Sequence, residues 1–134
     1  MSVSAEFIDF LLEQMAGFAP VSVRRMFGGA GLYRDGVMFG LVDDDALYLK
    51  VDDTNRGDFE SEGLAAFSYE TSDGRNTIMS FMRAPDRCLD DAEEMADWCR
   101  KAHAAALRGK KPKGRERKSS RTAGSRAGGN LERR

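Results

Sequence analysis

The stretch from Arg24 to Val51 constrains the fold of this chain more than any other part of the sequence. It contains three extended apolar and aromatic runs, separated by Arg34-Asp35-Gly36 and by Asp43-Asp44-Asp45. Short runs of this kind with Asp and Gly between them are typical of antiparallel strands joined by tight turns, where Gly36 can take a positive φ. The sequence therefore predicts a three-stranded antiparallel meander.

The first of these runs carries the glycines Gly28, Gly29 and Gly31. They do not fit a dinucleotide-binding GxGxxG motif, and the Gly-Lys-Ser/Thr of a phosphate-binding P-loop is missing. Glycine in a strand weakens regular pairing and often marks a bulge or a close approach of two backbone segments. We expect the glycine run to serve backbone geometry rather than chemistry.

The other elements are predicted from apolar spacing and from end signals. They are a helix over residues 4–17, a short helix over 53–62, strands over 67–71 and 76–83, and a helix over 90–108. Ser4 fits an N-cap, Gly17 and Gly63 fit helix ends, and Asp90 followed by Glu93 resembles a capping box. The order α-βββ-α-ββ-α predicts an α+β fold in which helices pack against a single antiparallel sheet.

The charge of the chain is divided between two segments that differ in sign. Residues 1–107 contain ten Lys and Arg against twenty Asp and Glu, whereas residues 108–134 contain eleven against two. We therefore expect a folded domain over 1–108 and a basic tail over 109–134 that is disordered in isolation, since it has few apolar residues to bury.

The basic tail has two interpretations. It could keep the protein soluble, or its cations could neutralise phosphates in non-specific, salt-sensitive contact with nucleic acid. The candidate contact residues are Lys110, Lys111, Lys113, Arg115, Arg117, Lys118 and Arg121.

No set of residues in the sequence indicates an enzyme. The one histidine, His103, lies near the end of the last helix, and we interpret it as a surface residue rather than a catalytic base. Cys88 and Cys99 are too far apart in sequence for a metal-ligand pair, and a buried, reduced thiol is the favoured interpretation of Cys99. We expect no cofactor, no metal and no catalytic residue.

A secretory leader and a membrane span are also not expected, which predicts a cytoplasmic protein.

Several motifs in the right order resemble the TfoX N-terminal domain family. They are Arg24-Arg25-Met26-Phe27-Gly28-Gly29, Gly31-Leu32-Tyr33, residues 38–42, residues 47–52 with Asn55-Arg56, Met79-Ser80-Phe81 before Pro85, and the helix start from Asp91 to Trp98. The resemblance covers about residues 7–108. It implies an antiparallel sheet with helices similar to secretion chaperones, often dimeric. The named members regulate natural competence together with the cyclic-AMP receptor protein, and they carry a second, helical domain after this one. Residues 109–134 of the present chain lack the apolar periodicity that such a helical domain needs.

The residues that could contact a partner or an anion are two groups of cations and three tyrosines. The cations are Arg24 and Arg25, with Lys50 and Arg56, and the tyrosines are Tyr33, Tyr48 and Tyr69. The alternative is a purely structural role, in which the arginines pair with Asp52 or Asp53 at the surface and the tyrosines only cover the sheet.

The sequence leaves three alternative functions, which the structure can help to distinguish. The first is a non-enzymatic regulatory or adaptor domain that works by protein contact, as a homodimer and with a transcription regulator. The second is a small-molecule or anion-binding module, or an uncharacterised enzyme, centred on Arg24, Arg25 and the Gly28–Gly31 run. The third is a chaperone-like dimer. A concave pocket with Arg24 or Arg25 pointing into it would favour the second, and a flat aromatic face would favour partner binding.

Overall fold

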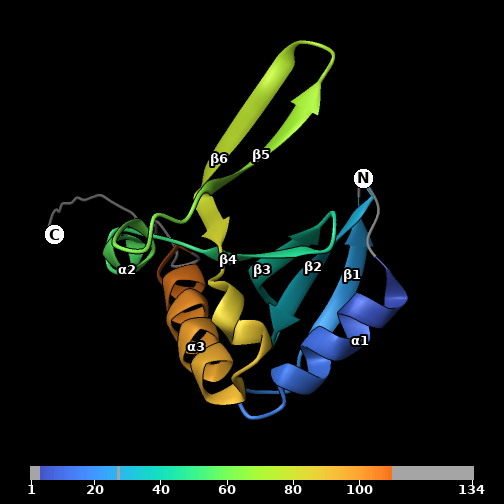
Figure 1. Cartoon of the computed structure of the whole chain (residues 1–134), viewed down its shortest axis with the longest axis vertical. Helices are drawn as coiled ribbons and strands as arrows, with labels where there is room; N and C mark the ends of the chain where they lie inside the picture. The colour runs from blue at the N-terminus through green and yellow to red at the C-terminus, as the bar shows by residue number, and fades with distance from the viewer. Residues whose placement is uncertain (1–3, 27, 110–134) are drawn as a thin grey trace, which may run out of the picture.

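The computed structural model describes residues 4–26 and 28–109, which form one antiparallel sheet with three helices (Figure 1). The helices are α1 (Ala5–Gln14), α2 (Arg56–Glu60) and α3 (Ala92–Gly109), with a 3₁₀ turn over Asp86–Leu89. The strands are β1 (Ser22–Met26), β2 (Gly29–Arg34), β3 (Val37–Asp43), β4 (Ala46–Lys50), β5 (Ala66–Thr71) and β6 (Gly74–Arg83). Their order in the sheet is β1-β2-β3-β4-β6-β5. The predicted α+β class is confirmed.

The first of the three predicted strands is two strands in the structure. β1 and β2 pair from Ser22 opposite Tyr33 to Met26 opposite Gly29. Gly28 lies between them with a φ of 81°, which glycine adopts without a steric cost. The chain therefore reverses inside a run that looked continuous, because no Asp or Asn marks the turn.

The close backbone approach expected of the glycine run is present at Gly29, whereas Gly31 is crowded by side chains. A Cβ on Gly29 would lie 2.5 Å from the carbonyl oxygen of Val42, and a Cβ on Gly31 would lie 2.8 Å from the terminal methyl of Met26. The two predicted turns are also confirmed. Asp35 and Gly36 have φ of 52° and 79°, and Asp44 and Asp45 have φ of 53° and 54°. Positive φ at both central residues is the feature of the type I′ hairpin turn.

The core lies between the sheet and the two long helices. Figure 1 shows α1 and α3 on the same side of the sheet, away from the β5–β6 hairpin. The largest fully buried side chains come from both layers and include Phe39, Leu32 and Leu49 of the sheet, Leu11 of α1 and Met95 of α3. None of the described helices covers the opposite face of β2, β3 and β4, and this face is called the outer face below.

The helix ends differ slightly from the predicted ones. Ser4 is the N-cap of α1, as predicted, and its Oγ accepts a hydrogen bond from the amide of Phe7 at 3.1 Å. α1 ends at Gln14, three residues before Gly17. The cap of α3 is Asp91, not Asp90: its Oδ1 accepts from the amides of Glu93 at 3.0 Å and Glu94 at 3.2 Å. Asp90 instead ends the preceding 3₁₀ turn.

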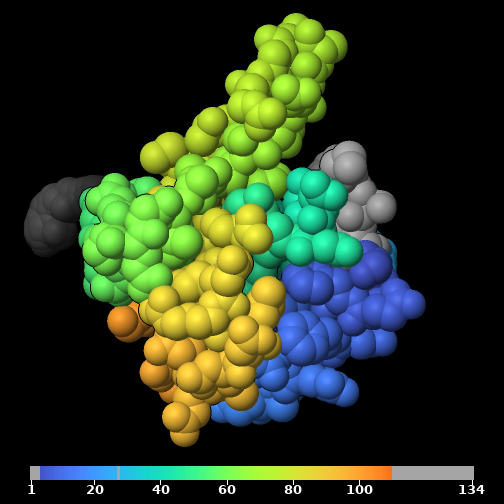
Figure 2. Space-filling view, in the orientation of Figure 1, coloured from blue at the N-terminus to red at the C-terminus, as the bar shows by residue number. Residues whose placement is uncertain are grey.

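The β5–β6 hairpin projects from the body of the molecule. Ala66 pairs with Met82, but the next residue, Phe67, pairs with Ile78, so three residues of β6 have no partner on β5. The outer half of β6 thus leaves the sheet together with β5. Residues 67–71 and 74–78 form a two-stranded ribbon, here called the arm, and Figure 2 shows it standing clear of the other elements.

Candidate functional site

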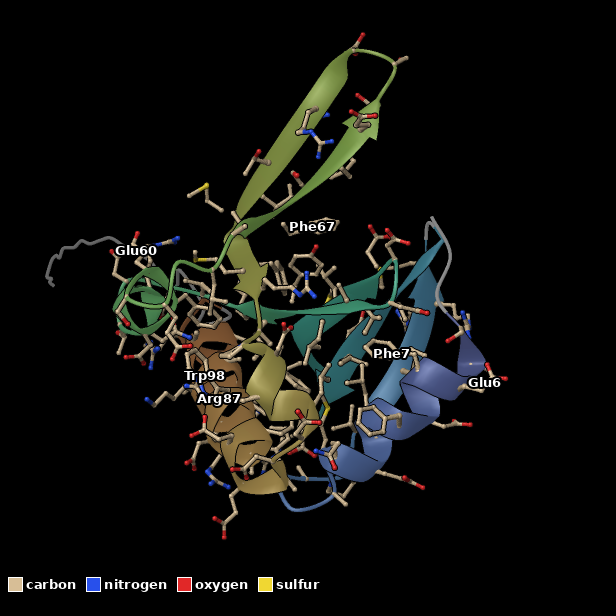
Figure 3. All side chains as sticks on the ribbon, in the orientation of Figure 1. Glu6, Phe7, Glu60, Phe67, Arg87 and Trp98 are labelled. Atoms are coloured by element: carbon tan, nitrogen blue, oxygen red, sulfur yellow. The ribbon has the colours of Figure 1, made fainter. Side chains whose placement is uncertain are left out.

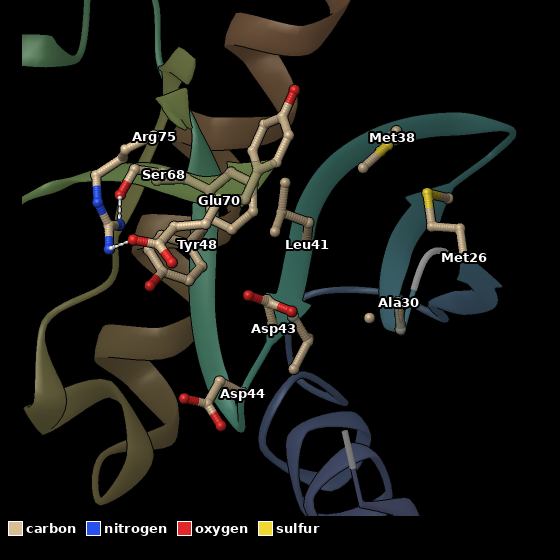
Figure 4. A pocket seen from close by; sticks show the side chains of 14 residues that line it. Met26, Ala30, Met38, Leu41, Asp43, Asp44, Tyr48, Ser68, Glu70 and Arg75 are labelled. Carbon is tan, nitrogen blue, oxygen red and sulfur yellow. Dashed lines mark hydrogen bonds and ion pairs between the residues drawn. The ribbon is translucent and has the colours of Figure 1, made fainter. Parts of the chain in front are cut away.

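The outer face of the sheet and the arm enclose an open hollow of about 990 Å³. Its floor comes from β2, β3 and β4 and one wall from the arm (Figure 4). The apolar lining residues are Met26, Met38, Leu41, Tyr48, Phe67 and Tyr69, and the polar ones include Asp43, Asp44, Ser68, Glu70 and Arg75. A concave, aromatic surface of this size can take part of a chain or a small ligand.

A bulge in β3 places its side chains on the correct faces. Leu32 pairs with Gly40 while the next residue, Tyr33, pairs with Met38, so Phe39 is an additional residue. Without it, strict alternation would put Phe39 and Val42 on opposite faces of the sheet, but both are fully buried in the core. The bulge therefore leaves Met38 and Leu41 to face the hollow.

Three aromatic rings connect the floor of the hollow to the arm. Tyr48 contacts Phe67 edge to face with ring centroids 4.9 Å apart, and Phe67 stacks against Tyr69 at 5.9 Å. Figure 3 shows Phe67 at the base of the arm, on the side that faces β4. Tyr69 remains 42% exposed. The rings provide apolar area that water still reaches.

Carboxylates stand at both sides of the hollow. Glu70 on the arm accepts from Arg75 at 3.2 Å, and Arg75 also donates to Ser68 at 2.8 Å. Asp43 and Asp44, at the end of β3, form no ion pair with any of the residues that the structure describes. The hollow thus offers two carboxylates that are available to a cation.

Arg24 and Arg25 lie on β1 and do not line the hollow. The guanidinium of Arg24 lies over the ring of Tyr33, 5.6 Å from its centroid, on the same face as Met26. Arg25 is the next residue of the strand, so its side chain leaves from the opposite face. The concave pocket is therefore present, but the two arginines do not point into it, and this arrangement does not favour an anion site.

Lys50 ends β4, the fourth strand of the sheet, and Arg56 begins α2, whereas Arg24 lies on the edge strand β1. Lys50 stacks over Phe81, 5.2 Å from the ring centroid. Arg56 donates to the carbonyl oxygen of Met79 at 3.0 Å and so holds α2 against the base of the arm. β2 and β3 separate β1 from β4, which places about 14 Å between these strands. The four cations do not form one patch.

The suggested pairing of Arg24 or Arg25 with Asp52 is wrong. Asp52 instead accepts two hydrogen bonds from Arg108, at 2.6 Å to Nε and 2.9 Å to Nη2. The Arg108 guanidinium lowers the pKa of the Asp52 carboxyl to about 2. This pair fixes the last turn of α3 beside the segment that follows β4.

His103 is not the surface residue that its position near a helix end indicated. Its ring lies 6.2 Å from that of Phe18 and 6.3 Å from that of Phe39, and its buried Nε2 has no hydrogen-bond partner among the described residues. Burial and the nearby charge of Arg34 lower the pKa of the imidazole. The charge of Asp35 acts on the ring in the opposite direction, but among the described residues no side chain forms a hydrogen bond with Nε2.

The two cysteines are buried free thiols, as predicted for Cys99. Burial raises the pKa of Cys88 to about 12, so its thiol stays protonated at neutral pH. The described residues hold no group of three or more metal-ligating side chains. None of the helices described is both long and apolar enough to cross a membrane.

A protein-family comparison matches residues 13–106 to the TfoX N-terminal domain, which covers more than half of the chain. The chain belongs to the TfoX N-terminal domain family. The resemblance inferred from sequence motifs is thereby confirmed. No curated protein matches the chain.

The TfoX N-terminal domain of this chain contains the whole sheet and every residue that lines the hollow. The candidate nucleic-acid contacts from Lys110 to Arg121 lie outside the described residues and beyond the family match. Of the predicted contact residues, the hollow contains Tyr48 and Tyr69, while Tyr33 lies on the same face under Arg24. The sequence interpretation missed Phe67 and Asp43. The alternation of Phe67 with Tyr69 was the available signal, since residues two apart on a strand share a face.

Proposed function

We propose that this chain is a non-enzymatic regulatory or adaptor domain of the cytoplasm, which binds a DNA-binding transcription regulator through the hollow. The observation that carries the proposal is the aromatic and methionine-rich hollow on a sheet face that none of the described helices covers. Exposed apolar surface of this kind, with a polar rim, is typical of protein-binding sites. Membership of the TfoX N-terminal domain family supports a role in competence regulation.

Charge complementarity supports a DNA-binding protein as the partner. Residues 1–107 carry twice as many acidic as basic side chains, and Asp43 and Asp44, at the rim of the hollow, form no ion pair with the part of the chain that the structure describes. Proteins that bind DNA carry clusters of Lys and Arg. The acidic rim would attract such a surface and orient it, while Tyr48, Phe67 and Tyr69 would provide the apolar contact.

The test is direct binding of the full chain to the cyclic-AMP receptor protein of the same bacterium, measured by biolayer interferometry. We expect Tyr48→Ala to weaken binding about tenfold or more, since a buried aromatic anchor is the usual hot spot of an interface. Phe10→Ala on α1 is the control, because it also removes an aromatic ring that solvent reaches, but on the helical side of the sheet. Binding that is absent, or equally weakened by both variants, contradicts the proposal.

Two further parts of the proposal have tests of their own. The homodimer predicted from the family resemblance is tested by light scattering over a range of concentrations, and a monomer throughout contradicts it. Nucleic-acid contact by Lys110 and the other tail cations is tested by gel-shift titration of the full chain and of a variant that ends at Gly109. If neither binds at low salt, that part is wrong.

A further inference from the structure

Cations in this structure repeatedly stack on aromatic rings. Arg24 lies over Tyr33, Arg34 over Phe18, Lys50 over Phe81 and Arg87 over Trp98, all within 6 Å of the ring centroid. Among the described residues, no cation lies over the three rings of the hollow, Tyr48, Phe67 and Tyr69. Each of these rings has a face or edge toward the hollow that can accept a guanidinium or an ammonium group.

The two carboxylates that form no ion pair with a described residue lie beside the rings. Asp43 and Asp44 line the same hollow as Tyr48, which is on the neighbouring strand β4 (Figure 4). A cation that stacks on a ring while its charge meets a carboxylate gains from both contacts, and arginine is best suited to this because its guanidinium is planar. The chemistry of the hollow therefore favours an arginine- and lysine-rich segment over an anion or an uncharged ligand.

The chain itself contains such a segment. Residues 110–134 carry ten Lys and Arg against two Glu. They follow α3, whose last turn is attached through Arg108 to Asp52, four residues after Tyr48 along the chain. Four residues of extended chain cover about 14 Å, whereas the 25 residues of the tail could reach about 80 Å. The tail therefore begins near the hollow and is long enough to enter it.

We infer that residues 110–134 bind in the hollow, with Arg and Lys side chains over Tyr48 and Tyr69 and paired with Asp43 and Asp44. Attachment to the same chain gives the tail an effective concentration on the order of millimolar at the hollow, which a separate basic partner must overcome. The tail is then a built-in competitor of the partner. The inference rests on the proposed use of the hollow for protein contact, but its test needs no partner.

The test is limited trypsin digestion of the full chain, with the rate of first cleavage within residues 110–134 followed by intact mass spectrometry. We expect slow cleavage at low salt and faster cleavage at 0.5 M NaCl, about the concentration at which surface charges are screened beyond a few ångströms. The double variant Asp43→Asn, Asp44→Asn should speed cleavage about fivefold at low salt. Asn tolerates the positive φ of residue 44, so the turn is preserved.

Two further variants separate docking from general charge. Asp9→Asn with Glu13→Gln removes the same two charges from exposed positions on α1, and it should leave the cleavage rate unchanged. Tyr69→Ala removes a ring without changing charge and should speed cleavage. Equal effects of both double variants, or a rate that none of the hollow variants changes, overturn the inference.

The concentration dependence of the rate identifies which tail occupies the hollow. A rate independent of protein concentration supports binding within one chain, whereas protection that grows with concentration assigns the hollow to the tail of a second copy and overturns the inference. If Tyr48→Ala abolishes receptor binding while the hollow variants leave tail cleavage unchanged, the proposed function stands and this inference falls.

Discussion

Tyr48 of β4 and Phe67 of the arm meet edge to face, with ring centroids 4.9 Å apart and ring planes inclined at 65°. The arm is otherwise a two-stranded ribbon, and such ribbons are marginally stable in water without further packing. Tyr48 is in the sheet and Phe67 is the first residue of the arm beyond the pair of Ala66 with Met82. This contact therefore sets how the arm stands over the sheet.

Phe67→Ala should loosen the arm without unfolding the domain. An aromatic pair contributes about 0.5–1.5 kcal/mol beyond its buried area, so amide hydrogen exchange in residues 67–71 and 74–78 should become about three- to tenfold faster. The melting temperature should change little, because Phe67 is only partly buried. Tyr69→Ala is the control, because it removes the ring that stacks on Phe67 further along the arm and leaves the contact between Tyr48 and Phe67 in place. Equal exchange in wild type and Phe67→Ala contradicts the role of this contact.

Gly29→Ala should destabilise the protein by about 1–3 kcal/mol, because the new methyl group would collide with backbone. Its Cβ would lie 2.5 Å from the carbonyl oxygen of Val42, which cannot move without breaking the β2–β3 pairing. Gly57→Ala in α2 is the opposite case. A Cβ there meets nothing within 4 Å, so this variant should stabilise by about 0.5 kcal/mol. Chemical denaturation of both variants measures the difference, and a neutral Gly29→Ala contradicts the close approach.

Arg108→Ala should raise the pKa of the Asp52 carboxyl from about 2 toward its usual value. The pair stabilises the folded state above the unfolded-state pKa of Asp52, near 3.8, and this contribution disappears as the pH falls through about 2. The wild type should therefore be more stable than Arg108→Ala at pH 7, with the difference vanishing toward pH 2. Carboxyl NMR titration of Asp52 gives the pKa directly. An unchanged pKa in Arg108→Ala contradicts the assignment.

The single histidine gives the domain a second pH dependence, of opposite chemical origin. Burial first, and then the charge of Arg34, lower the pKa of His103 below the 6.5 of the free side chain. The unfolded chain then takes up its proton before the folded one, so stability is complete above about pH 6.5 and falls as the pH drops toward the folded-state pKa. His103→Phe should remove this slope between pH 7 and pH 5, measured by urea denaturation. The same slope in both proteins contradicts the buried position of the ring.

Much of the fold could be predicted because local signals carried it. Asp35-Gly36 and Asp44-Asp45 marked their turns with residues that tolerate positive φ, and Gly63 marked the end of α2 with a φ of 69°. The β1–β2 hairpin could not be recognised, because Gly28 lies among other glycines and apolar residues. Its effect depends on the pairing of Met26 with Gly29, which is visible only in the folded sheet.

The candidate site was predictable only in part, for a similar reason. Tyr48 and Tyr69 were identified as residues of an outer sheet face, since alternation along a strand fixes which side chains share a face. The hollow itself arises from the bend in β6, where residues 79–81 have no partner on β5. Such a bend has no local signal. Arg24 and Arg56 seemed related in sequence because both are cationic, but Arg24 lies on the edge strand β1 and Arg56 lies on α2, against the base of the arm.

The measurement that tests the central claim most directly is hydrogen–deuterium exchange of the full chain, alone and saturated with the cyclic-AMP receptor protein. The proposed function predicts slower exchange at Tyr48 and from Phe67 to Glu70 in the complex, with α1 unchanged. Protection confined to α1, or no change in the arm and β4, would contradict the claim that the hollow is the protein-binding surface.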